Sequence, residues 1–221
     1  MQLLYQSHSP YARKVLVFAH EAGLADRIEV IHQETSPVER NPDVFALNPL
    51  GKVPVLVCDD GTVLFESAVI CEYLDGQHEG RRLFPSAPAA RFRALLHQAV
   101  ALGLADAGIA VRWESKRRPE ALRWPPLLEG QLQKVIAACD YLEDRMVDDQ
   151  AVDVGDIAVA TALSWIEFRQ IHDFQYGRPR LSAWYQAFCA RPSMRATPLS
   201  GDTIDRPQSA REGVPHAVAV D

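Results

Sequence analysis

Residues 7–14, SHSPYARK, lie between a short apolar run at residues 3–5 and a segment at residues 15–19 whose apolar side chains repeat at a helical spacing. The apolar run predicts a strand, and the segment after it predicts a helix that ends at Gly23. Ser9 and Pro10 suit the start of that helix, because Ser is a common N-cap and Pro needs no N–H at the first helical position. The corner has two interpretations: a helix cap alone, or a reactive hydroxyl at a helix N-terminus.

The first 75 residues continue this alternation of strand and helix patterns. Strands are predicted at residues 27–32, 53–58 and 62–65, and helices at 41–49 and 67–74. The Asp59-Asp60-Gly61 sequence predicts a hairpin turn between the last two strands, because Asp-Gly tolerates the backbone that tight turns need. Ser67 is the expected N-cap of the last helix. The order βαβ, then α, then ββα indicates an α/β domain.

The composition changes at residues 76–88, GQHEGRRLFPSAP, which predict an interdomain linker. No strand pattern follows, and helices are expected over residues 87–116, 125–146, 154–171 and 180–190. Asp153 and Asp156 predict a capping box, which we assign to folding and not to chemistry. Domains are therefore expected at residues 1–77 and 86–200, the second of them all-α. The expected tail, residues 201–221, has little apolar surface to bury.

Composition and charge argue against several classes of protein. The 221 residues are 48% hydrophobic and 24% charged, which is typical of a globular chain. A net charge of −6 without a dominant Lys/Arg face argues against nucleic-acid binding. No signal-peptide pattern is seen and no apolar run approaches membrane-spanning length, so a cytoplasmic protein without a membrane partner is expected. The four cysteines lie apart in apolar segments, which predicts buried free thiols, and no spacing indicates a metal site.

Two further stretches suit a peptide-like ligand. In residues 48–56, NPLGKVPVL, Pro54 is tolerated at the start of a strand if the Val53–Pro54 bond is cis, which leaves the Val53 N–H and C=O free to pair. In residues 65–70, FESAVI, the Ser67 hydroxyl and N–H suit a carboxylate, and Glu66 suits an ammonium group. Taken singly, a loop proline and a capping serine are the simpler interpretations.

Three fragments in this order resemble the glutathione S-transferase family: SPYARK (9–14), NPLGKVPVL (48–56) and ESAVICEYL (66–74). The resemblance extends over roughly residues 1–200. It implies a thioredoxin-like N-terminal domain followed by an all-α C-terminal domain. It also implies glutathione as co-substrate, a hydrophobic electrophilic small molecule as second partner, a role in detoxification and a homodimer. Serine at the active corner, with RWESKRRPE and IEFRQ further on, is most similar to a bacterial serine-type subgroup of the cytosolic transferases.

The resemblance gives each site residue a role. Ser9, which precedes Pro-Tyr, occupies the catalytic position, where its hydroxyl would donate a hydrogen bond to the glutathione sulfur and stabilise the thiolate. Such a charge-assisted bond contributes about 1.5–3 kcal/mol, or roughly one to two pKa units. Val53 would pair with the cysteinyl part through its backbone, and Lys52 would reach the glycyl carboxylate. Glu66 and Ser67 would hold the γ-glutamyl end.

Several alternatives stay open at this point. Ser7 is a second candidate donor, and Arg13 either faces the site or has a structural role. A hydrolase built on His8 and a neighbouring serine is disfavoured, because adjacent side chains of an extended segment point apart. The electrophile is expected to bind between the domains, with four candidate contacts: Arg112, Trp113, Glu114 and Trp124.

The activity itself also has alternatives. Serine in place of the cysteine of thiol-reductase relatives disfavours thiol-disulfide exchange and favours conjugation by an enzyme. The other interpretations are a non-catalytic glutathione-binding or regulatory module, and a specialised dehalogenase, isomerase or peroxidase. The homodimer implied by the family would use the helices at residues 67–75 and 87–116.

Overall fold

The N-terminal half of the computed structural model, which describes residues 1–145 and 151–203, has the predicted βαβ-α-ββα order. Its elements are β1 (Gln2–Tyr5), α1 (Pro10–Glu21), a 3-10 turn (Ala25–Arg27), β2 (Glu29–His32), α2 (Pro42–Leu47), β3 (Val55–Val57), β4 (Val63–Leu64) and α3 (Ser67–Asp75). The sheet order is β2-β1-β3-β4, with β1 parallel to β2 and antiparallel to β3, and β3 antiparallel to β4. This four-stranded mixed sheet confirms the thioredoxin-like prediction.

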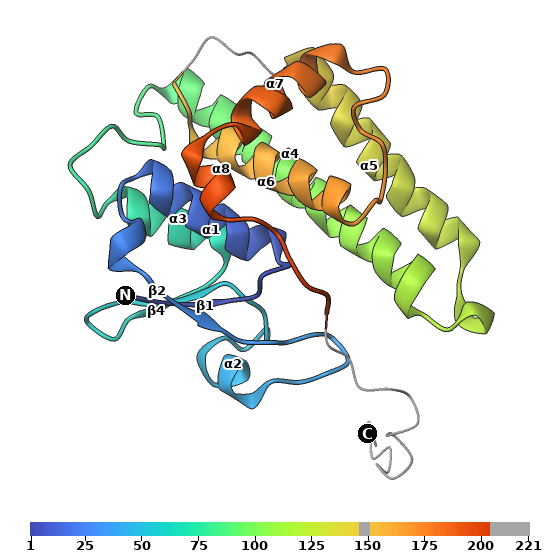
Figure 1. Cartoon of the computed structure of the whole chain (residues 1–221), viewed down its shortest axis with the longest axis horizontal. Helices are drawn as coiled ribbons and strands as arrows, with labels where there is room; N and C mark the ends of the chain where they lie inside the picture. Colours follow the sequence, from blue (N-terminus) through green and yellow to red (C-terminus); the bar gives the residue numbers. More distant parts are fainter. Residues whose placement is uncertain (146–150, 204–221) are drawn as a thin grey trace.

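The strands bury both faces of the sheet. Leu3 belongs to the main core, which includes side chains of α1 and α3, whereas Leu4 packs with Val44 of α2 and with Val55. The alternation follows from the two-residue period of a strand, which sends successive side chains to opposite faces. Figure 1 shows α2 on one side of the sheet and α1 and α3 on the other. Gly61 has a φ of +84° in the β3–β4 turn, in accord with the predicted hairpin.

The second half is all-α, as predicted. It contains α4 (Pro88–Arg112), a π-helical turn (Trp113–Arg117), a 3-10 turn (Glu120–Leu122), α5 (Pro125–Arg145), α6 (Val154–Phe168), α7 (Pro179–Cys189) and α8 (Pro192–Ala196). The helix predicted over 87–116 therefore changes to π geometry at Trp113, and the one predicted over 154–171 ends at Phe168. Residue 146 of the helix predicted over 125–146 lies outside the described residues.

Helix α4 corrects one expectation from the sequence. With the π turn included, Pro88–Arg117 is long and apolar enough to cross a membrane by length and composition. Half of its most apolar window is buried inside the fold, and α4 packs on α5 and α6. The core helix of a soluble protein passes the same test, and Figure 1 shows α4 alongside α5 and α6.

The N-terminus of α6 has the predicted capping box. The Asp153 N–H donates to Asp156 Oδ2 at 3.0 Å, and the Asp156 N–H donates to Asp153 Oδ1 at 3.1 Å. Burial, together with the Asp153 charge, raises the pKa of Asp156 to about 7. Both side chains thus cap the N-terminus of α6, the helix of the second half that packs on α1 of the first half.

Helix α1 joins the two halves. Arg13 on α1 is buried and donates to Ser164 Oγ of α6 at 2.6 Å and to the Met194 carbonyl of α8 at 3.0 Å. The Trp165 indole donates to the His8 carbonyl at 2.9 Å. Of the two roles that the sequence left open for Arg13, the structural one therefore fits, and the corner before α1 is fixed to α6.

The cysteines have no disulfide: Cys58, Cys71 and Cys139 are buried, and Cys189 is partly buried. This confirms the prediction of free thiols. Burial raises the pKa of Cys71 to about 12 and that of Cys139 to about 12, so both thiols stay protonated at neutral pH.

The chain returns to the first corner after α8. The Ser200 N–H donates to the Ser7 carbonyl at 3.0 Å, and the Ser7 hydroxyl donates to the Ser200 carbonyl at 2.9 Å. Figure 1 shows this segment running from α8 back towards the sheet. Of the predicted tail at 201–221, residues 201–203 are described and the others lie outside the described residues. The domain boundaries given from the sequence stay a prediction.

Candidate active site

Ser9 is the N-cap of α1, and its geometry allows it to be both a helix cap and a hydroxyl that binds a ligand. Its φ and ψ of −89° and 122° are extended, and its Oγ accepts a hydrogen bond from the Ala12 N–H at 3.2 Å. Pro10 follows as the first helical residue. A hydroxyl has one proton to donate and two lone pairs to accept with, so the cap uses an acceptor site only. The Ser9 O–H therefore remains able to donate to a ligand.

The Ser9 corner opens into a cavity of about 390 Å³ between the two halves of the chain. The N-terminal half contributes Ser9, Lys52 and Val53 together with loop residues such as Thr35, Phe45 and Gly51. The helical half contributes Ile109, Arg112, Trp113, Trp165 and Arg169. Three of the five predicted glutathione-site residues thus line one cavity, and the other two, Glu66 and Ser67, are not part of its wall.

The loop before β3 is held by Asn48, which the sequence analysis did not single out. The buried Asn48 amide donates to the Lys52 carbonyl at 2.8 Å, and its oxygen accepts from the Leu50 N–H at 3.0 Å. Gly51 has a φ of +60°, and the Thr35 hydroxyl donates to its carbonyl at 2.9 Å. These contacts set the position from which Lys52 and Val53 face the cavity.

The Val53–Pro54 peptide bond is cis, as the sequence analysis required for an open Val53 backbone. Val53 is buried, and within residues 1–145 and 151–203 no backbone hydrogen bond uses its N–H or its C=O. An extended ligand in the cavity could pair with both groups.

The start of α3 differs from the prediction. Glu66, not Ser67, is the N-cap: its carboxylate accepts from the Ala68 N–H at 2.7 Å, and Ser67 is the first helical residue. The Glu66 side chain caps the helix, and Ser67 is buried. The Ser67 hydroxyl is buried and has no hydrogen-bond partner in the described part of the chain. Glu66 is exposed.

Ser7 and His8 have partners other than a ligand sulfur. The Ser7 hydroxyl and the Ser7 carbonyl both form hydrogen bonds with the Ser200 backbone, so they hold the C-terminal segment in place. The His8 ring lines the cavity and lies 3.4 Å from Thr203 Oγ1. Burial lowers the pKa of His8, and the Arg169 and Arg112 charges lower it further against the opposing effect of Glu34. His8 is therefore neutral at neutral pH.

The four expected electrophile contacts separate into two pairs. Arg112 and Trp113 line the cavity. Glu114 is buried and accepts hydrogen bonds from the Arg118 guanidinium and the Trp124 N–H, so it braces the turn after α4. Trp124 is exposed and is not part of the cavity wall, which makes the expectation for this second pair wrong.

The structure adds lining residues that the sequence analysis missed. The Tyr11 hydroxyl donates to Asp106 of α4, and burial together with this bond raises the tyrosine pKa. Arg169, just after α6, and Thr203 also line the cavity. Arg169 belongs to the quoted IEFRQ segment, but only the packing of α6 on α1 shows that it faces Ser9's cavity.

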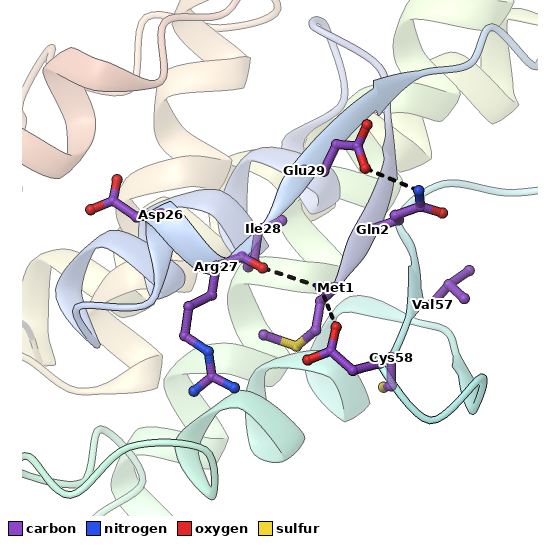
Figure 2. Close-up of a pocket in the computed structure, with 9 residues that line it drawn as sticks. Met1, Gln2, Asp26, Arg27, Ile28, Glu29, Val57 and Cys58 are labelled. Carbon is purple, nitrogen blue, oxygen red and sulfur yellow. Dashed lines mark hydrogen bonds and ion pairs between the residues drawn. The ribbon is translucent and has the colours of Figure 1, made fainter.

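A second hollow lies at the other end of β1 (Figure 2). There the Met1 ammonium group contacts Asp59 at 2.7 Å and donates to the Arg27 carbonyl at 3.2 Å, and Gln2 Nε2 donates to Glu29 at 3.0 Å. Several polar groups of this hollow therefore pair with one another. No group of three or more metal-ligating side chains is found among the described residues.

A thioredoxin-like sheet joined to a helical half, with a serine-capped helix facing a cleft between them, defines the architecture of a cytosolic glutathione transferase. The family models for the glutathione S-transferase N-terminal and C-terminal domains match residues 8–77 and 125–187. The chain belongs to the glutathione S-transferase family.

Individual relatives agree with this assignment. The uncharacterized GST-like protein YibF of Escherichia coli (strain K12) is 31% identical over 202 residues, covering 89% of this chain and 98% of that protein. A glutathione transferase family member from Pseudomonas fluorescens Pf-5, solved with bound glutathione, is 38% identical with a TM-score of 0.87, covering 90% and 99%. A second structure from that strain, with bound S-(propanoic acid)-glutathione, is also 38% identical with a TM-score of 0.82, covering 91% and 100%.

Proposed function

We propose that this chain is a glutathione transferase in which Ser9 stabilises the glutathione thiolate for attack on a small electrophile. The observation that carries the proposal is the Ser9 hydroxyl, which accepts from the Ala12 N–H, keeps its own proton for donation, and belongs to a residue that lines the cavity between the two halves. A thiol has a pKa near 8.5, so a donor and a helix N-terminus at the sulfur increase the share of reactive thiolate.

Glutathione would lie with its cysteinyl part along Val53, whose N–H and C=O are open, and with its glycyl carboxylate towards Lys52. Its γ-glutamyl end would reach the start of α3, where the carboxylate supplies a partner for the buried Ser67 hydroxyl and the ammonium group meets Glu66. The solved relatives with bound glutathione and with S-(propanoic acid)-glutathione support this ligand for the cavity.

Calorimetric titration with glutathione, followed by turnover assays on a panel of electrophiles, tests the proposal. We expect saturable binding of one glutathione per chain and glutathione-dependent consumption of at least one electrophile class. Binding without turnover across halide, epoxide, peroxide and unsaturated carbonyl compounds would instead assign the chain as a glutathione-binding module. No binding would refute both assignments.

We also propose a cytoplasmic homodimer formed through α3 and α4. Three large apolar side chains on these helices are exposed: Val69, Phe92 and Leu96, with Phe92 72% exposed. A second copy that covers them would remove this apolar surface from water. Sedimentation of the full chain should show a species of twice 24.6 kDa, and Phe92→Glu should shift it towards the monomer. Sedimentation of the wild type as a monomer would refute the dimer but would leave the proposed chemistry unaffected.

A further inference from the structure

The wall of the cavity contributed by the helical half holds two guanidinium groups. Arg112 is the last residue of α4, Arg169 follows α6, and the side chain of each is only 10% exposed. Both form an ion pair with one carboxylate, that of Asp202, which lies 3.2 Å from Arg169 Nη1 and is 61% exposed. Two nearly buried positive charges thus contact the same exposed carboxylate.

Arg169 has donors that the protein does not use. Its Nη1 donates to the Gly201 carbonyl at 3.3 Å, in addition to the ion pair with Asp202. Its Nε and Nη2 are buried and have no hydrogen-bond partner in the described part of the chain. A buried charge that is only partly paired is costly, and a guanidinium presents its donors in a planar fork that fits a carboxylate. The unused edge of Arg169 is therefore suited to an anion.

The two arginines lie in the cavity in which the glutathione sulfur is proposed to react. Arg112 and Arg169 line the same cavity as Ser9. His8, which directly precedes Ser9, is close enough to both guanidinium groups for their charges to lower its pKa, although burial is the larger cause. Because His8 is then neutral, it neither adds to nor cancels the charge of the pair. Arg117 lies close by and donates to the Thr203 carbonyl, so a third guanidinium group lies near Arg169.

We infer that Arg169, assisted by Arg112, forms an anion subsite for the second substrate, and that the electrophile carries a carboxylate. This inference rests on the proposed transferase function and specifies its substrate class. The carboxylate binds the unpaired Nε and Nη2 edge of Arg169 and takes no part in the bond changes. The glutathione sulfur forms a bond to the electrophilic carbon, the leaving group departs with its bonding electron pair, and the thiol proton passes to water.

Binding of matched glutathione conjugates tests the subsite without requiring turnover. The probes are S-(4-carboxybenzyl)glutathione and S-(4-carbamoylbenzyl)glutathione, which differ only in the charge of the distal group. Calorimetry on the wild-type chain should show that the carboxylate conjugate binds at least about tenfold more tightly than the amide conjugate. Tenfold in Kd corresponds to the lower end of the free energy of a hydrogen bond to a charged group. In Arg169→Gln the Kd values of the two conjugates should differ by no more than about twofold, because the loss of the positive charge weakens binding of the carboxylate conjugate only.

Two further variants distinguish the loss of the charge at residue 169 from a general effect of the substitution on folding. Arg195→Gln removes an exposed arginine of α8, outside the cavity wall, and should keep the wild-type preference. Arg169→Lys keeps the charge but not the planar fork, and should restore part of the preference. If Arg169→Gln unfolds, Arg169→Lys still gives the answer, since a lysine variant with the full wild-type preference would refute a role for the fork.

The outcomes distinguish the subsite from the transferase proposal. Equal binding of the two conjugates to the wild type, or an unchanged preference in Arg169→Gln, would overturn the inference, and turnover of neutral electrophiles would then leave the transferase proposal in place. A carboxylate preference that depends on Arg169, without turnover of any electrophile, would support the subsite and refute the transfer. Failure of both conjugates to bind would refute both.

Discussion

Replacement of Ser9 by alanine should raise the pKa of enzyme-bound glutathione by about one to two units, because it removes a hydrogen bond to the thiolate of about 1.5–3 kcal/mol. The thiolate is the reactive form, and at pH 7 its share of the bound glutathione should drop as the pKa returns towards about 8.5, so kcat/KM for a conjugation reaction should fall about 8- to 25-fold. The pH–rate profile should converge with that of the wild type at high pH, where the thiol ionises in both proteins. A rate that falls equally at all pH values would point to misplacement of glutathione.

The cap function of Ser9 needs a matched control, since its Oγ also accepts from the Ala12 N–H. Alanine at an N-cap costs about 1 kcal/mol of stability, whereas glycine costs only a few tenths. Ser9→Ala and Ser9→Gly should therefore lose the same amount of thiol activation but differ in melting temperature. Ser7→Ala serves as a second control, because Ser7 binds Ser200, and it should leave the pKa of the bound thiol unchanged. A Ser7→Ala defect equal to that of Ser9→Ala would contradict the assignment.

Gly155→Ala should destabilise the protein by about 2–3 kcal/mol, since it overpacks a close contact between helices. A Cβ at this position would lie 2.6 Å from the Ala94 carbonyl oxygen and 3.0 Å from the Ala94 Cα, which are backbone atoms of α4. Helix α6 would have to move away from α4, and the cavity residues on both helices would move with it. For a chain of this size the melting temperature should fall by about 5–10 °C.

Gly103→Ala on α4 provides the control for this effect. A Cβ at Gly103 meets nothing within 4 Å, and the residue is exposed. Alanine there should stabilise the helix by about 0.5–1 kcal/mol, because only the backbone entropy term remains. Thermal unfolding of the two variants side by side gives shifts of opposite sign if the α4–α6 contact is as close as described. Two similar shifts would contradict it.

Much of the fold could be predicted because the signals are local. The alternation of Leu3 and Leu4 between two cores, the Gly61 turn and the Asp153–Asp156 capping box each depend on residues close in sequence. The proline at the start of a strand allowed either a cis bond before Pro54 or an ordinary loop proline, and the structure has the cis bond. The helix start at Ser9 is also a local signal, whereas the choice of Ser9 as the catalytic position came from the family resemblance.

The part of the site that could not be predicted depends on how distant helices pack. Arg112 and Arg169 are 57 positions apart, and no periodicity relates the end of α4 to the end of α6. The wrong N-cap at α3 has a different origin, because Glu66 and Ser67 can both cap a helix and only the backbone geometry decides between them. Glu114 and Trp124 were misplaced for a third reason: the turn after α4 pairs them with each other.

Titration of the bound glutathione thiol tests the central claim most directly. The ultraviolet absorbance of the thiolate can be followed against pH in the wild-type complex and in the complex with Ser9→Ala. The proposed role of Ser9 predicts a wild-type pKa about one to two units below the free-thiol value of about 8.5, and a return towards that value in Ser9→Ala. A wild-type pKa at or above about 8.5, or one that Ser9→Ala leaves unchanged, would contradict it.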